Sequence, residues 1–70
     1  MDTIDFIKYI NKQRKLGGWY GFNGTVNGKD ITIKGYGTWL QIFKINGLSV
    51  PTGIDLKVKD YNKLLNKYIG

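Results

Sequence analysis

The chain has 70 residues and a formal net charge of +6, and it contains no cysteine and no histidine. This length predicts one domain over residues 1–70, with a core that stabilises it only modestly. Without cysteine there can be neither a disulfide nor a thiolate zinc site, so the composition favours the reducing cytoplasm. Apolar runs are too short to span a membrane, and the N-terminus does not read as a signal peptide.

Residues 3–16 are expected to form the first helix. Isoleucine recurs there at helical spacing, Asp2 or Thr3 can cap the first turn, and the glycine pair at 17–18 stops the helix. The chain's one arginine, Arg14, falls in the last turn, where a cation complements the helix dipole.

Residues 19–26 and 29–36 are expected to pair as an antiparallel hairpin. The Asn-Gly pair at 27–28 is a strong two-residue turn signal, and such a turn sets the register so that Phe22 faces Ile33. One face then carries the apolar residues Tyr20, Phe22, Val26, Ile31 and Ile33. The other, mostly polar face carries Trp19, Asn23, Thr25, Asp30, Thr32, Lys34 and Tyr36.

A third strand is expected at 39–45. If the preceding turn is at 36–37, Leu40 and Ile42 extend the apolar face by pairing with residues 33 and 31. The residues that then extend the polar face are Trp39, Gln41, Phe43 and Ile45. A longer turn would exchange the two faces of this strand.

The remaining elements complete a two-layer α+β fold. A second Asn-Gly pair at 46–47 predicts a turn into a short fourth strand at 48–50, which Pro51 ends, and residues 57–69 show helical spacing. The order predicts an N-terminal helix, a three- to four-stranded antiparallel meander and a C-terminal helix. We expect both helices on the apolar face; the alternative places one helix on each face.

The residue types argue against catalysis. Histidine and glutamate, the usual general acids and bases, are absent, and Ser49 has no histidine to activate it. The aspartates are scattered, and the glycines match no phosphate-binding loop. The sequence therefore predicts a protein that is not an enzyme, with no catalytic residues, no metal site and no cofactor.

Aromatic and basic side chains are the better candidates for function. Trp19, Tyr36, Trp39 and Phe43 share the predicted polar face with Lys34. Aromatic rings beside cations stack and neutralise single-stranded nucleic acid, and they also form the energetic centre of protein interfaces. The plainer interpretation is that these rings are core residues beneath a helix.

The second helix carries a stripe of lysines at a spacing of four, Lys59, Lys63 and Lys67. They could follow a phosphate backbone or contact an acidic protein, although the solvated face of an amphipathic helix has the same pattern. Because specific base reading relies on arginine, this lysine-rich chain suits diffuse attraction better than sequence readout.

The overall profile is a very short, basic, non-catalytic domain whose many Lys, Ile, Asn and Tyr residues are typical of AT-rich coding. Phage and mobile-element proteins that block a host complex, anti-CRISPR proteins among them, share this profile of size and composition. The profile predicts an inhibitor or adaptor, monomeric or homodimeric, in the cytoplasm (of the host cell if a phage encodes it). Its partner would be a host protein or nucleoprotein complex with an acidic surface, or nucleic acid, and not a membrane. The alternatives are a weakly specific RNA or single-stranded DNA module and a small phage structural subunit.

Overall fold

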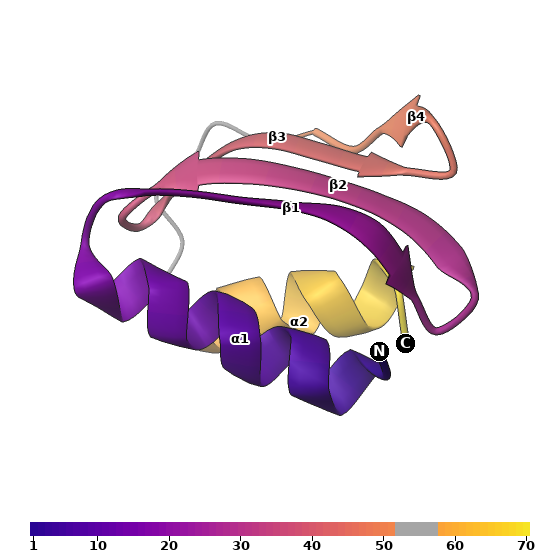
Figure 1. Ribbon diagram of the computed structural model, residues 1–70, viewed down its shortest axis with the longest axis horizontal. Helices are drawn as coiled ribbons and strands as arrows, with labels where there is room; N and C mark the ends of the chain where they lie inside the picture. Colours follow the sequence, from indigo (N-terminus) through magenta and orange to yellow (C-terminus); the bar gives the residue numbers. More distant parts are fainter. Residues whose placement is uncertain (52–57) are drawn as a thin grey trace.

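The computed structural model describes residues 1–51 and 58–70, with the side chains of Val58 and Lys59 left out. A four-stranded antiparallel sheet forms one layer, and both helices pack against the same face of it (Figure 1). The elements are α1 (Thr3–Leu16), β1 (Trp19–Val26), β2 (Lys29–Tyr36), β3 (Trp39–Ile45), β4 (Leu48–Ser49) and α2 (Val58–Tyr68). The predicted two-layer α+β fold with one-sided helix packing is therefore confirmed.

Local signals explain the ends of α1. The Asp2 side chain accepts a hydrogen bond from the backbone N–H of Asp5 at 2.8 Å, which satisfies one of the unpaired donors of the first turn. At the other end Gly17 takes the left-handed conformation, with φ 73°, and its N–H bonds to the Arg14 carbonyl. These caps set the two ends of α1, and with them the length of helix that covers the sheet.

The first hairpin has the register that its turn predicts. Phe22 pairs with Ile33, and the turn residues Asn27 and Gly28 have φ angles of 51° and 75°. Both angles lie in the left-handed region that the favoured two-residue hairpin turn needs, which Asn and Gly tolerate best. The strands run in the simple order β1-β2-β3-β4, so every connection in the sheet is a hairpin.

The third strand differs from its predicted register. The structure places the turn one residue later, at 37–38, so that Tyr36 pairs with Trp39, and the pairing then shifts between Lys34 and Gly35. At this irregularity Ile42 pairs with Lys34 and Leu40 with Gly35, so the register passes over Gln41, as in a β-bulge. The predicted pairs of Leu40 with residue 33 and of residue 42 with residue 31 are therefore wrong.

The bulge exchanges the faces of the second half of β3. Phe43 pairs with Ile33 and is 1% exposed, so it belongs to the core and not to the polar face on which the alternating pattern placed it. Ile45 likewise packs against the core, while Ile42 moves to the opposite face beside Lys34. One extra residue in a strand reverses every later side chain, because side chains alternate with a period of two.

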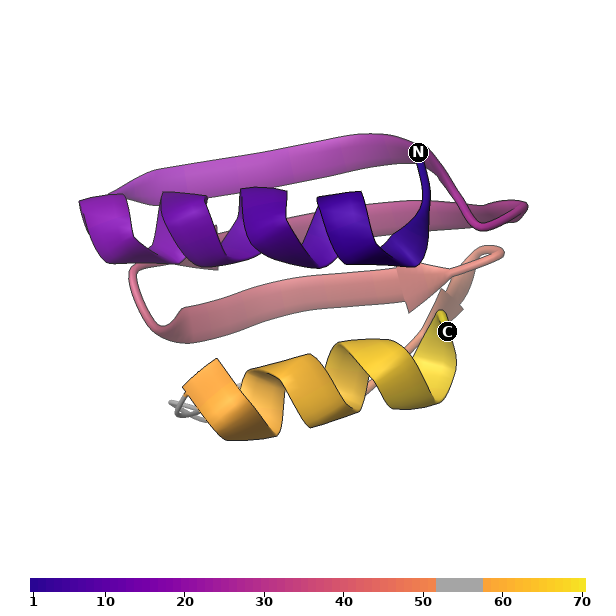
Figure 2. The ribbon, with the colours of Figure 1, turned by 90° about the horizontal axis from the view of Figure 1, so that it is seen from below.

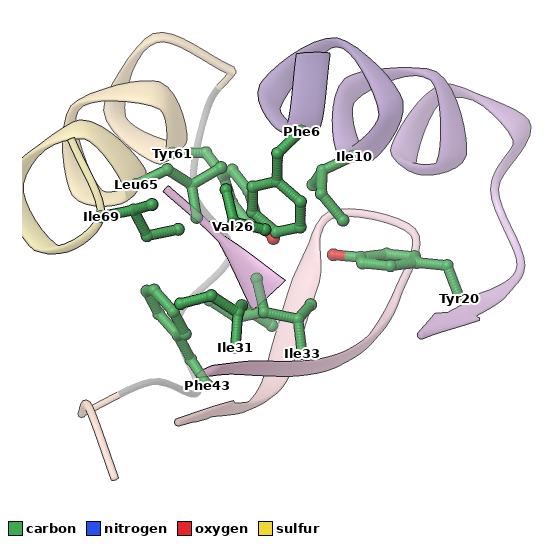
Figure 3. Close-up of a cluster of buried hydrophobic side chains, with 11 residues drawn as sticks. Phe6, Ile10, Tyr20, Val26, Ile31, Ile33, Phe43, Tyr61, Leu65 and Ile69 are labelled. Atoms are coloured by element: carbon green, nitrogen blue, oxygen red, sulfur yellow. The ribbon is translucent and has the colours of Figure 1, made fainter. Parts of the chain in front are cut away.

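The core fills the space between the helices and the inner face of the sheet. Figure 3 shows side chains from both layers pointing toward one another. Among the described residues, the large side chains that are fully buried are Phe6, Ile10, Val26, Ile31, Ile33, Leu40, Phe43, Tyr61, Leu65 and Ile69. In the view from below, α1 lies in front of the first strands and α2 runs beside β3 (Figure 2).

A polar group also lies between the layers. Arg14 is 5% exposed, its guanidinium carbon lies 3.9 Å from the centre of the Tyr61 ring, and Nη2 donates to the Thr38 carbonyl at 3.4 Å. Burial, together with the neighbouring Tyr20 hydroxyl, raises the pKa of Tyr61 far above its usual value, and nearby Arg14 opposes this only in part. The Tyr61 phenol therefore stays protonated at neutral pH.

A candidate binding surface on the outer face of the sheet

The outer face of the sheet is the side away from both helices, and none of the described elements covers it (Figure 1). Strand pairing, with the bulge included, decides which side chains point there. They are Trp19, Asn23, Thr25, Asp30, Thr32, Lys34, Tyr36, Trp39, Ile42 and Lys44. This set is called the outer face below.

Three aromatic rings gather at one end of the outer face. The Trp19 ring centre lies 5.2 Å from that of Tyr36, with an interplanar angle of 68°, and 6.1 Å from that of Trp39, at 59°. Trp19 and Tyr36 are 59% and 50% exposed, and Trp39 is half-buried. The Trp19–Tyr36 pair is edge to face and the Trp19–Trp39 pair is tilted, and the three rings leave a large apolar area in contact with water. We call them the aromatic cluster.

A lysine lies directly beside the aromatic cluster. Lys34 Nζ is 5.2 Å from the centre of the Trp19 ring, within the range of a cation–π contact. Lys44 shares the same face two residue pairs further along the sheet, and Asp30 is its acidic member. The outer face therefore has a net positive charge next to exposed aromatic rings.

The outer face is hollowed next to Trp19. A shallow depression of about 570 Å³ extends over β1 and β2 and is lined in part by Trp19, Asn23, Lys34 and Ile42. Gly21 lies between Trp19 and Asn23 on this face, opposite Lys34, and its missing side chain leaves the space open. At the far side of the hollow, the Thr32 hydroxyl donates to the Asn23 side-chain oxygen at 3.3 Å. The hollow therefore combines an aromatic wall, a cation and polar groups.

The structure divides the residues that the sequence analysis grouped together. It unites Trp19, Tyr36, Trp39 and Lys34 on one exposed surface. It removes Phe43, because the bulge turns that ring into the core.

The lysine stripe of α2 belongs to a different surface. Helix α2 packs on the inner face of the sheet, so Lys63 and Lys67 are exposed on the side away from the aromatic cluster. Lys67 Nζ lies 5.4 Å from the Tyr68 ring. The side chain of Lys59 lies outside the described residues.

Sequence reasoning missed two members of the outer face, Ile42 and Lys44. Their position depends on the bulge at Gln41, and the sequence contains one sign of it. The adjacent apolar residues Ile42 and Phe43 cannot both follow a strict alternation in a strand with one buried face. A glycine on the neighbouring strand, Gly35, lies next to the irregularity.

Neither a metal site nor a membrane-spanning helix is found in the described residues. No cluster of three carboxylates within them could hold a metal ion. Over the same part of the chain, no helix has the length and apolar character needed to cross a bilayer. In comparisons with known proteins, no family model matched the sequence, and neither a curated protein nor a solved structure gave a significant match.

Proposed function

We propose that this protein is a small non-enzymatic inhibitor or adaptor of the phage or mobile-element type, which docks on a larger host protein or nucleoprotein complex. The observation that carries this proposal is the aromatic cluster, exposed beside Lys34 on a sheet face that neither helix covers. Tryptophan and tyrosine supply most of the binding energy at protein interfaces, because they bury a large area at a small entropic cost.

Charge argues for an acidic partner surface. The chain carries a net charge of +6, and Lys34 and Lys44 lie on the outer face with the aromatic cluster. Lysines at the rim of an interface raise the rate of encounter with an acidic partner and add little to the affinity once the partner is bound. The aromatic cluster would thus provide the affinity, and the lysines would guide the approach.

The test is a pull-down of tagged protein from a nuclease-treated lysate of the natural host, repeated with paired variants. Trp19→Ala should weaken capture of the partner by at least about thirtyfold, as for a typical interface hot spot. Leu48→Ala is the matched control, because Leu48 is 74% exposed at the edge strand β4 and lies outside the aromatic cluster. Equal losses in both variants, or in neither, would contradict the proposal.

A second pair of variants tests the role of charge. Lys34→Glu should slow association and reduce its dependence on salt, whereas Lys63→Glu, on the helix side, should leave both unchanged. If Lys63→Glu has the larger effect instead, docking uses the helix layer and the outer face is not the interface.

Direct binding of RNA or single-stranded DNA is the second candidate, favoured by the hollow beside Trp19. A base could stack in this space, with Lys34 close enough to neutralise a phosphate. Titration of the tryptophan fluorescence with oligonucleotides at about 50 and 200 mM salt separates the candidates. Tight binding that survives the higher salt and is lost in Trp19→Ala favours nucleic acid, and weak binding that vanishes with salt favours a protein partner.

A further inference from the structure

The two edges of the sheet differ in how far they are protected against further pairing. The edge strand β4 has two residues and is soon followed by Pro51, which cannot donate to a ladder. The edge strand β1 has eight residues, Trp19–Val26, and contains neither a charged residue nor a proline. Because proteins usually blunt long edges with charge, proline or brevity, β1 is an edge suited to pairing.

The free backbone groups of this edge can be assigned from the ladder. The Gly18 carbonyl accepts from the Gly37 N–H, so the even-numbered residues of β1 direct their backbone groups to β2 and the odd-numbered residues direct theirs outward. The outward residues Trp19, Gly21, Asn23 and Thr25 are all exposed. In the described part of the chain, the Tyr9 hydroxyl lies 3.5 Å from the Gly21 carbonyl, a long contact that leaves this oxygen able to accept another bond.

We propose that β1 pairs antiparallel with β1 of a second copy of this chain, about a two-fold axis at Phe22. Only a register in which odd-numbered residues pair with odd-numbered residues lets the outward groups bond to each other. The register centred on Phe22 does so and, apart from the two Phe22 side chains that meet at the axis, places large side chains opposite small ones. It pairs Trp19 with Thr25 and Tyr20 with Gly24 of the second copy.

Charges on α1 complement each other in the same arrangement. Tyr9 marks the side of α1 that faces the β1 edge, since its hydroxyl reaches Gly21 and its ring lies 6.2 Å from Phe22. Asp5 and Lys12 lie one turn before and one turn after Tyr9, on the same side of the helix. The two-fold axis makes the two copies of α1 antiparallel, which brings Asp5 of each copy toward Lys12 of the other.

Pairing through β1 produces a closed dimer. Each copy uses its β1 edge in an isologous contact, and the short β4 strands are left at the outside. The two sheets become one, with both aromatic clusters on a continuous outer face. Thr25 of the second copy then borders the hollow beside Trp19. This inference does not depend on the proposed function, because it follows from the edge and the helix charges alone.

The first test is sedimentation equilibrium of the purified protein over a range of concentrations. The wild-type chain should be dimeric at micromolar concentration. Asn23→Pro removes an outward N–H without removing a β1–β2 bond and should weaken dimerisation by about a hundredfold. Asn23→Ala keeps the N–H and is the matched control, which should remain dimeric. A wild-type protein that stays monomeric at millimolar concentration, or an Asn23→Pro variant that dimerises normally, overturns the proposal.

The second test uses charge and does not alter the strand. Asp5→Lys and Lys12→Asp each place like charges together in a homodimer, and each should weaken dimerisation by about tenfold. A mixture of the two variants restores opposite charges in the heterodimer, which should form as readily as the wild-type dimer. Recovery in the mixture also shows that both variants are folded. If mixing does not restore dimerisation, the antiparallel placement of α1 is wrong and the proposed axis is overturned.

Discussion

Replacing Gly35 by alanine tests the packing that positions the aromatic cluster. A Cβ atom at this position would lie 2.5 Å from the Tyr20 hydroxyl oxygen and 2.6 Å from the Trp39 carbonyl oxygen, both far inside van der Waals contact. The Trp39 oxygen belongs to the backbone of a paired strand, and Tyr20 is buried, so neither can move without disturbing the core. Overpacking usually costs about 1–3 kcal/mol, and two such fixed neighbours place Gly35→Ala at about 3 kcal/mol or more.

The control for this prediction is the same chemical change in the neighbouring strand. A Cβ at Gly21 would meet nothing closer than the Ile33 carbonyl oxygen at 3.5 Å, an ordinary contact, so Gly21→Ala should change stability by less than about 1 kcal/mol. Urea unfolding followed by tryptophan fluorescence and circular dichroism measures both variants. A domain of this size has a total stability of only about 4–10 kcal/mol, so Gly35→Ala should unfold at much lower urea. If Gly35→Ala is within about 0.5 kcal/mol of the wild type, the bulged register of β2 and β3 is wrong.

The remaining predictions concern the core, the helix cap and pH. Phe43→Ala should destabilise the domain by about 3–5 kcal/mol, and Trp39→Ala by clearly less, as measured by urea unfolding. A larger loss in Trp39→Ala than in Phe43→Ala would contradict the buried position of Phe43. Asp2→Ala should cost about 1 kcal/mol through the lost cap of α1, and an unchanged unfolding midpoint would contradict that role. Above about pH 10 the unfolded chain ionises Tyr61 while the folded protein, in which the pKa of Tyr61 is raised, does not. The free energy of unfolding should therefore fall by about 1.4 kcal/mol per pH unit above pH 10 because of Tyr61. Urea titrations at several pH values measure this dependence, and Tyr61→Phe should remove the part that comes from Tyr61. If the variant and the wild type show the same dependence on pH, this account of Tyr61 is wrong.

Local chemistry explains why most of the fold could be predicted. Several element boundaries coincide with a residue whose backbone preference acts within a few positions, such as Asp2 and Gly17 at the ends of α1. The Asn-Gly pairs at 27–28 and 46–47 take the left-handed angles that their turns require. Such signals do not depend on the rest of the chain, so they can be read without it.

The candidate site could be predicted only for the first hairpin, whose register is set by its two-residue turn. Trp19, Lys34 and Tyr36 lie on strands joined by a two-residue turn, and the structure places them on the outer face as the alternating pattern predicts. Trp39 also lies there, although through a different turn from the one considered. The prediction for Phe43 was wrong because the bulge lies between Trp39 and Phe43 and turns Phe43 to the inner face.

The sequence by itself determined the order of the elements, the register of the first hairpin and the basic character of the chain. Only the tertiary structure decided that both helices cover one face and that β3 bulges at Gln41. The physical reason is that β3 has apolar residues at both odd and even positions. The alternation of its side chains therefore favours two registers about equally. The choice between them depends on which apolar side chains the helices can bury, and on whether Gly35 leaves room for the neighbouring strand.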